Sequence, residues 1–358
     1  MARRIYVRIL LTSHISGRLD RLIYTTETKT NLAYMRLVLP GRIDFPANLA
    51  TETKTIVGGK TVSESVDANV AEFYARQHRV RLTRDGDALL VGITQVDGTL
   101  DPRMDLLTGD ALQFAFARPM PWVLVERIVD GMHRVEVRSR RIEPKAGRRL
   151  PPLELTMENG AALWEITARF LTYVASHSGE GRHPLSARVC DVLDAAAASI
   201  DAHALTLAVV IEGTLSTEFR DVVQPDGSTL QQIRRALVAL RAAVPEERFI
   251  SRATGALNRL GEVSARDRLW RLVENGIVTQ QQAKDWLDLR NRLAHANRAT
   301  DLPRQPFVDL LFRVTVLFHH LVFAAIGYHG KDTDYGDPDK WSTRTYSGAD
   351  ATLGMAPG

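Results

Sequence analysis

Residues 143–153 read Glu-Pro-Lys-Ala-Gly-Arg-Arg-Leu-Pro-Pro-Leu, and the residue pattern of the chain changes across them. Three prolines and a glycine in this stretch break regular structure, and its charges keep it solvated. We interpret it as a connector between two parts of the chain that have different secondary structure.

Short apolar or alternating runs precede the connector, as is typical of β-strands. They lie at 5–11, 34–39, 80–82, 88–93, 122–125 and 134–138. Turn signals such as Pro40-Gly41 and Asp130-Gly131 separate them. Many short strands of this kind predict a β-rich domain over residues 1–150, built as a sandwich or partly open barrel. Within it, segment 66–78 has Val66, Val70 and Phe73 near helical spacing and is predicted to form a helix.

Helical patterns follow the connector. They start with 160–176 and continue through about 186–200, 203–219, 229–243, 247–260, 264–275, 279–297 and 306–327. We therefore expect an α+β fold: the β-rich domain, a connector with helices over 151–202, an all-helical domain over 203–335, and an extended tail over 336–358.

Composition narrows the function classes. The chain has 358 residues, of which 45% are hydrophobic and 25% charged, as in ordinary globular proteins. Its one cysteine, Cys190, excludes an intramolecular disulfide and a thiolate-rich zinc site, and is expected to be a core thiol. No uncharged apolar run of about 18 residues is present and the start has no signal-peptide core, so we expect a cytoplasmic protein without membrane association, metal or cofactor.

Charge is distributed unevenly. Residues 1–150 carry a net charge of +7, whereas residues 151–358 carry −3. A basic run at 133–149 is open to two interpretations: it holds RNA backbone, or it is the solvated face of a strand followed by a charged linker. On the first interpretation the RNA-binding residues are Arg138, Arg140, Arg141, Arg148 and Arg149.

Segment 279–297 carries the most informative pattern. Thr279 and Gln282 match a capping box at the start of a helix. The apolar stripe then runs through Ala283, Trp286 and Leu287 to position 290, which is Arg290. A charge on the core face is costly unless it is paired, so Arg290 is expected to have a specific partner or to face a cleft or subunit interface.

Asn291 and His295 lie four residues apart on the same face, and the long Arg290 side chain can bend toward the same edge. An imidazole can exchange protons near neutral pH, a guanidinium can stabilise a phosphate, and an amide can orient either one. These three residues therefore suit phosphodiester chemistry. The alternative is structural: a histidine bonded to the last carbonyls of a helix, and an arginine in an ordinary ion pair.

Other polar residues leave similar choices. Glu212 ends an apolar helix. It either pairs with Arg290 or helps to set the protonation state of His295, or it is an ordinary carboxylate near a helix end. His319 and His320 have no evident set of further ligands, so they are interpreted as packed or interface histidines.

The stretch Leu289-Arg290-Asn291-Arg292-Leu293-Ala294-His295 resembles the Arg-x4–6-His motif of the HEPN superfamily, and its context is similar to the ApeA-like branch. The resemblance covers about 203–335 and includes the apolar helix at 205–213 and the closing run at 325–335.

This resemblance implies a helical bundle that forms a homodimer and cleaves RNA without a metal. The motif residues Arg290, Asn291 and His295 would meet at the dimer interface, and the RNA 2′-hydroxyl would act as nucleophile to leave a cyclic phosphate and a 5′-hydroxyl. It also implies a role in bacterial anti-phage defence through abortive infection, with tRNA among the candidate substrates and a phage-derived or nucleotide trigger acting at the N-terminal domain. Because some HEPN proteins bind without cleaving, a non-catalytic dimeric binding or sensor protein remains the alternative.

Overall fold

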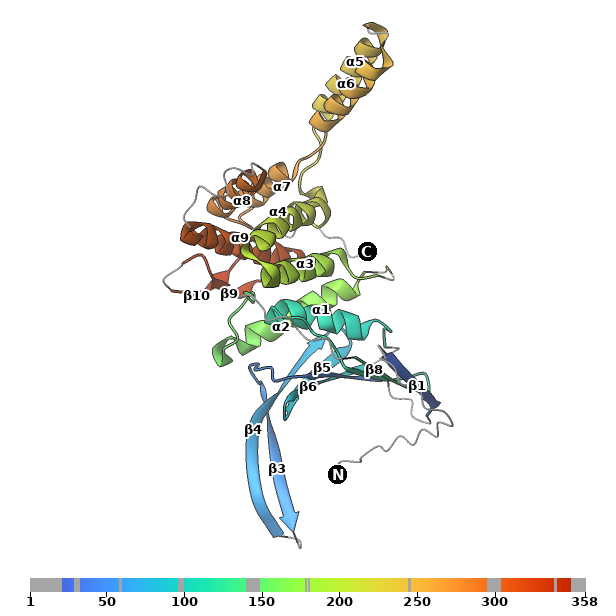
Figure 1. Cartoon of the computed structure of the whole chain (residues 1–358), viewed down its shortest axis with the longest axis vertical. Helices are drawn as coiled ribbons and strands as arrows, with labels where there is room; N and C mark the ends of the chain where they lie inside the picture. Colours follow the sequence, from blue (N-terminus) through green and yellow to red (C-terminus); the bar gives the residue numbers. More distant parts are fainter. Residues whose placement is uncertain are drawn as a thin grey trace.

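The computed structural model describes residues 21–28, 33–57, 60–95, 100–139, 149–177, 179, 181–243, 246–294, 304–337 and 340–348. Within this part the chain forms an antiparallel sheet followed by helices, which confirms an α+β fold with a β-rich N-terminal part. Figure 1 shows the sheet at one end of the molecule, with the helices stacked on it in successive layers.

Eight strands form one sheet in the order β1-β8-β7-β2-β6-β5-β4-β3. The strands are β1 (Arg21–Glu27), β2 (Tyr34–Pro40), β3 (Leu49–Val57), β4 (Lys60–Ala75), β5 (His78–Asp85), β6 (Ala88–Gln95), β7 (Leu124–Val129) and β8 (Met132–Arg138). Its first and last strands do not pair with each other, so the strands predicted as a sandwich or partly open barrel form a single open sheet. Met35, Leu37 and Leu39 alternate with less buried neighbours along β2, as expected for a sheet with one covered face.

The predicted helix at 66–78 is wrong, because these residues belong to β4 and to the turn that follows it. Ala71, Phe73 and Ala75 are buried at a period of two, and β4 pairs with β5 across the turn. Arg76 adopts a left-handed conformation there, with φ 54°. The spacing of apolar residues fits both periods over so short a segment, and pairing with β5 favours the strand.

Helices α1 (Met104–Phe116) and α2 (Gly160–Ala175) cover the sheet, as Figure 1 shows. Trp164 of α2 stacks on Phe73 of β4 at 5.8 Å between ring centroids, and its Nε1 donates a hydrogen bond to the Pro46 carbonyl. The apolar core runs without interruption from the sheet through these helices to the C-terminal helices. The residues on either side of the predicted boundary at 150 therefore share one core.

The remaining helices are α3 (Pro184–Ala198), α4 (Ile200–Thr217), α5 (Gly227–Ala243), α6 (Glu247–Leu260), α7 (Ala265–Glu274), α8 (Gln280–Ala294) and α9 (Arg304–Ile326). Helices α4, α7, α8 and α9 pack into a bundle, whereas α5 and α6 form a hairpin that projects from the body (Figure 1). Two short 3₁₀ helices lie at Met157–Asn159 and Arg220–Val222.

The helix α9 is long and apolar enough to cross a membrane by length and composition, with a mean hydropathy of 1.7. However, 72% of its apolar window is buried inside the protein, as in the core helix of a soluble protein. The helix packs against α8, α4 and α2.

The tail contains regular structure. Strands β9 (Gly330–Asp334) and β10 (Ser342–Tyr346) form a two-stranded antiparallel sheet beside α9. Tyr328, Tyr335 and Tyr346 are buried around this sheet. The segment predicted as an extended tail from 336 therefore includes a strand whose last residue, Tyr346, is anchored in the core.

Candidate functional site

The helix α8 begins with the predicted capping box. Thr279 Oγ1 accepts a hydrogen bond from the Gln282 backbone N–H at 3.2 Å, and Gln282 Oε1 accepts one from the Thr279 N–H at 2.9 Å. These two bonds satisfy backbone donors that the first turn of a helix otherwise leaves free. The side-chain amide of Gln282 also lies 3.0 Å from His320 Nδ1, so the cap ties the start of α8 to α9.

The apolar part of the buried face of α8 consists of Ala283, Trp286 and Leu289, each with no exposed surface. Trp286 Nε1 donates a hydrogen bond to the Ala208 carbonyl of α4 at 3.2 Å. This bond and the packing of the indole hold α8 against α4, and so fix the direction in which the end of α8 points.

Arg290 is not on the buried stripe, contrary to the sequence prediction. Its side chain is 47% exposed, because the stripe passes through Leu289 and leaves position 290 at the edge facing α4. The expected specific partner is nevertheless present: Arg290 Nη2 lies 3.1 Å from Glu212 Oε2. The guanidinium carbon also lies 5.7 Å from the centre of the Trp286 ring, within the range of a cation–π contact.

Of the other motif residues, Asn291 is exposed next to Arg290, and His295 lies outside the described residues. The structure thus brings together Arg290 and Glu212, from segments 78 residues apart, with Asn291 following on the same helix. Arg292 instead binds Asp288 at 2.9 Å, one turn earlier on α8. A half-exposed guanidinium, oriented by a carboxylate and an aromatic face, is able to receive a phosphate from solvent.

Two of the arginines predicted to bind RNA have partners within the protein. Arg138 on β8 donates from Nε to Glu136 Oε1 at 2.7 Å and from Nη2 to Asp105 Oδ2 at 2.9 Å. Burial, the largest single influence, raises the pKa of Glu136, but the hydrogen bond and charge of Arg138 together with the charges of Arg21 and Arg127 outweigh it and hold that pKa below its usual value. Arg149 donates to the Leu193 carbonyl at 3.0 Å. Arg140, Arg141 and Arg148 lie outside the described residues.

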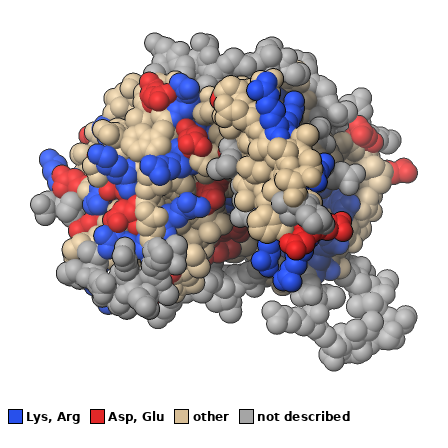
Figure 2. Space-filling model, turned by 90° about the horizontal axis from the view of Figure 1, so that it is seen from above, with Lys and Arg blue, Asp and Glu red and all other residues tan. Residues whose placement is uncertain are grey.

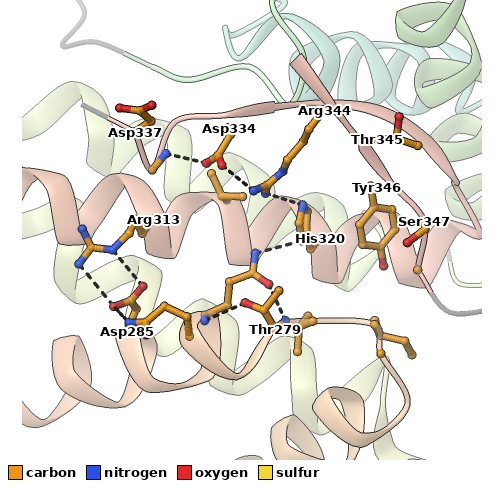
Figure 3. A pocket seen from close by; sticks show the side chains of 18 residues that line it. Thr279, Asp285, Arg313, His320, Asp334, Asp337, Arg344, Thr345, Tyr346 and Ser347 are labelled. Atoms are coloured by element: carbon orange, nitrogen blue, oxygen red, sulfur yellow. Dashed lines mark hydrogen bonds and ion pairs between the residues drawn. The ribbon is translucent and has the colours of Figure 1, made fainter. Parts of the chain in front are cut away.

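A pocket of about 510 Å³ lies at the other end of α8, and the sequence did not reveal it. The turn before α8, the helices α8 and α9, and the β9–β10 segment line it (Figure 3). Two half-buried guanidiniums face it, and each is held by carboxylates. Arg313 binds Asp285 at 3.0 Å, and Arg344 binds Asp334 at 2.6 Å.

His320 forms the inner wall of this pocket and is almost fully buried. Its Nδ1 meets the Gln282 amide, and its Nε2 lies 2.9 Å from Asp332 Oδ2. Burial lowers the pKa of His320, although Asp332 acts in the opposite direction. Arg344 Nη2 also lies 3.2 Å from Nε2, so both ring nitrogens have partners in the pocket wall, and His320 links α8, α9 and the β9–β10 segment.

Two further predictions for buried residues are confirmed. His319 is packed in the core, where burial lowers its pKa to about 3. Cys190 is a buried free thiol, and burial raises its pKa to about 12. Among the residues that the structure describes, no three His, Cys, Asp or Glu side chains gather closely enough to hold a metal ion.

The pocket could have been suspected from one feature of the sequence. The run Asp332-Thr333-Asp334 and the later Arg344 place opposite charges in a tail that also carries Tyr328, Tyr335, Trp341 and Tyr346, and aromatic residues at this frequency are unusual for a disordered end. What the sequence does not give is the fold-back of that tail onto α8 and α9.

Comparison of the chain with protein-family models, with curated proteins and with solved structures finds no match.

Proposed function

We propose that this chain is a metal-independent endoribonuclease of the HEPN type that acts as a homodimer in bacterial anti-phage defence. The observation that carries the proposal is the Arg290–Glu212 pair. It leaves a guanidinium oriented at an exposed edge, one residue before Asn291 and shortly before His295. This is the chemistry expected of a phosphate ligand beside an acid–base group.

In the proposed reaction, one His295 imidazole takes the proton of the RNA 2′-hydroxyl. The 2′-oxygen attacks the adjacent phosphorus, and the bond from phosphorus to the 5′-oxygen breaks. The second copy's His295, in its protonated imidazolium form, gives its proton to the leaving 5′-oxygen and becomes neutral, which leaves a 2′,3′-cyclic phosphate and a 5′-hydroxyl. Arg290 stabilises the negative charge that develops on the phosphate, and Glu212 positions Arg290.

The proposal also assigns a role to the β-rich part and a location to the protein. The β-rich part would sense a phage-derived or nucleotide trigger or select the RNA, with tRNA as one candidate substrate. A cytoplasmic location fits a chain with a single, buried cysteine and an apolar α9 that is packed in the core.

The test is cleavage of labelled RNA by purified protein in excess EDTA. We expect the wild type to cleave and the His295→Ala variant to lose cleavage. Arg292→Gln is the matched control, because it removes a cation from the same helix that is paired with Asp288 rather than facing the proposed site. Retained cleavage by His295→Ala, or strict dependence on a divalent metal, would refute the mechanism.

The second candidate is a non-catalytic dimeric binding or sensor protein. The pocket at the start of α8 favours it, because its volume lies within the range of small-molecule sites. This alternative predicts that no RNA pool is cleaved and that His295→Ala keeps its function in cells.

A further inference from the structure

The projecting hairpin of α5 and α6 contributes no residue to the proposed active site. Its two helices pack on each other through one apolar stripe, in which Ile233 is buried and Leu237 and Ile250 are half-buried. Figure 1 shows the hairpin standing away from the bundle. Its outward faces are therefore available to a partner.

Those outward faces carry arginines for which the described part of the chain offers no side-chain partner. Arg234, Arg235, Arg241, Arg248 and Arg252 are all exposed. None of the five forms a hydrogen bond or ion pair with a residue that the structure describes. Many arginines of the body, in contrast, are matched with carboxylates, as Arg79 is with Glu72 and Arg188 with Glu218. Seen from the hairpin end, basic and acidic side chains are interspersed (Figure 2), so the distinguishing feature is the missing partners rather than a uniformly basic face.

Exposed apolar side chains lie among these arginines. Arg234, Val238 and Arg241 follow one another at i, i+4 and i+7 on α5, and Val238 is 70% exposed. On α6, Phe249 is 56% exposed and lies one turn from Arg252. Cations for phosphates, with an aromatic ring on which a base can stack, are the features that bind single-stranded nucleic acid.

We propose that the α5–α6 hairpin is an RNA-binding arm that captures single-stranded RNA through phosphate contacts of its free arginines and stacking on Phe249. The choice of RNA rests on the proposed function, since the arm alone requires only a flexible polyanion. The arm would raise the local concentration of RNA around the chain and so favour substrates long enough to reach both the arm and the end of α8.

The test measures binding of a labelled 20-nucleotide single-stranded RNA by fluorescence anisotropy, with the His295→Ala chain so that no RNA is cut. The arm variant combines Arg234→Gln, Arg241→Gln, Arg248→Gln and Arg252→Gln. The matched control combines Arg42→Gln, Arg79→Gln, Arg169→Gln and Arg271→Gln, which removes the same charge from exposed residues that are already paired.

Loss of four phosphate contacts should lower the salt dependence of binding by about 3 in log–log slope. Between 50 and 200 mM salt, the affinity of the parent chain should therefore fall about 50-fold more than that of the arm variant, while the control follows the parent. Equal behaviour of the two variants, or no measurable RNA binding, would overturn the proposal. Binding to phosphatidylcholine–phosphatidylserine vesicles (7:3) that depends on the arm, with RNA binding that does not, would overturn it in favour of a membrane partner.

Two outcomes of these experiments distinguish the RNA-binding arm from the proposed nuclease activity. Arm-dependent binding without any cleavage by the wild type refutes the nuclease and leaves the arm. Cleavage by the wild type with arm-independent binding refutes the arm and leaves the nuclease.

Discussion

Replacing Arg290 with glutamine separates a catalytic role from a structural one. The ion pair with Glu212 joins two side chains that are about half exposed, and such pairs contribute about 0.2–1 kcal/mol to stability. The contact with the Trp286 ring adds about 0.5–1 kcal/mol at an exposed position. Arg290→Gln should therefore lower the free energy of unfolding by at most about 2 kcal/mol.

Loss of a donor that stabilises developing charge costs far more in rate, about 100- to 1,000-fold. We therefore expect Arg290→Gln to remain folded and to lose at least about 100-fold in single-turnover RNA cleavage. Urea unfolding measures the first quantity, and cleavage at saturating protein measures the second. Glu212→Gln should lose less activity, because Glu212 acts only by orienting Arg290. Unchanged cleavage in a folded Arg290→Gln protein would refute the reasoning, and so would a loss that matches the unfolded fraction.

Three further variants test the packing and capping of the helices around Arg290 and Glu212. Burial lowers the pKa of His203 to about 4, so below about pH 6.5 the unfolded chain binds a proton at this residue while the folded chain does not. The free energy of unfolding should therefore fall by on the order of 1 kcal/mol between pH 7.5 and 5.5 because of His203. Urea unfolding of His203→Gln should show an acid sensitivity that is smaller by this amount, and an unchanged sensitivity would contradict the prediction. Trp286→Ala should lower the free energy of unfolding by about 3–5 kcal/mol in the same assay, because a fully buried indole is removed; a change below about 1 kcal/mol would contradict this packing. Gln282→Ala should lower the free energy of unfolding by about 1–3 kcal/mol, because it removes both a cap bond and the partner of His320. The same substitution at the exposed neighbour, Gln281→Ala, should lower it by less, and equal effects would contradict the role of the cap.

Local signals predicted the framework of the site. The capping box at Thr279 fixed where α8 begins, because it depends only on residues three apart. The charge at position 290 predicted either a specific partner or a position facing a cleft or subunit interface. The structure shows the partner, Glu212, whose pairing with Arg290 was one of the interpretations of that carboxylate. The broad change from strands to helices across 143–153 also required only local pattern and turn residues, although the sequence pattern did not predict α1, a helix that lies before this stretch.

The predictions that failed concern features that depend on tertiary contacts, which local sequence patterns do not contain. Segment 66–78 fits two periods, and only its pairing with β5 makes it a strand. The orientation of α8 about its own axis depends on tertiary contacts such as the hydrogen bond of Trp286 to α4. In that orientation Arg290 lies at the exposed edge of the helix and not on the expected buried stripe. The pocket needs the tail to fold back, so that Arg344 reaches Asp332 and Asp334 beside His320.

The arginines of the α5–α6 hairpin also show that local sequence does not predict tertiary partners. An arginine-rich composition gives no indication of which guanidiniums are bound by carboxylates, because partners such as Asp105 for Arg138 come from distant segments. The sequence singled out the run at 133–149, whereas the structure shows exposed arginines on α5 and α6 that have no ion-pair partner among the described residues.

The central claim is best tested by mapping the chemical ends of cellular RNA after induction of the wild type and of His295→Ala. The account predicts new RNA ends in the wild type only, with a 2′,3′-cyclic phosphate on one side of each cut and a 5′-hydroxyl on the other. New ends that carry a 5′-phosphate and a 3′-hydroxyl, or the same ends in both strains, would contradict it.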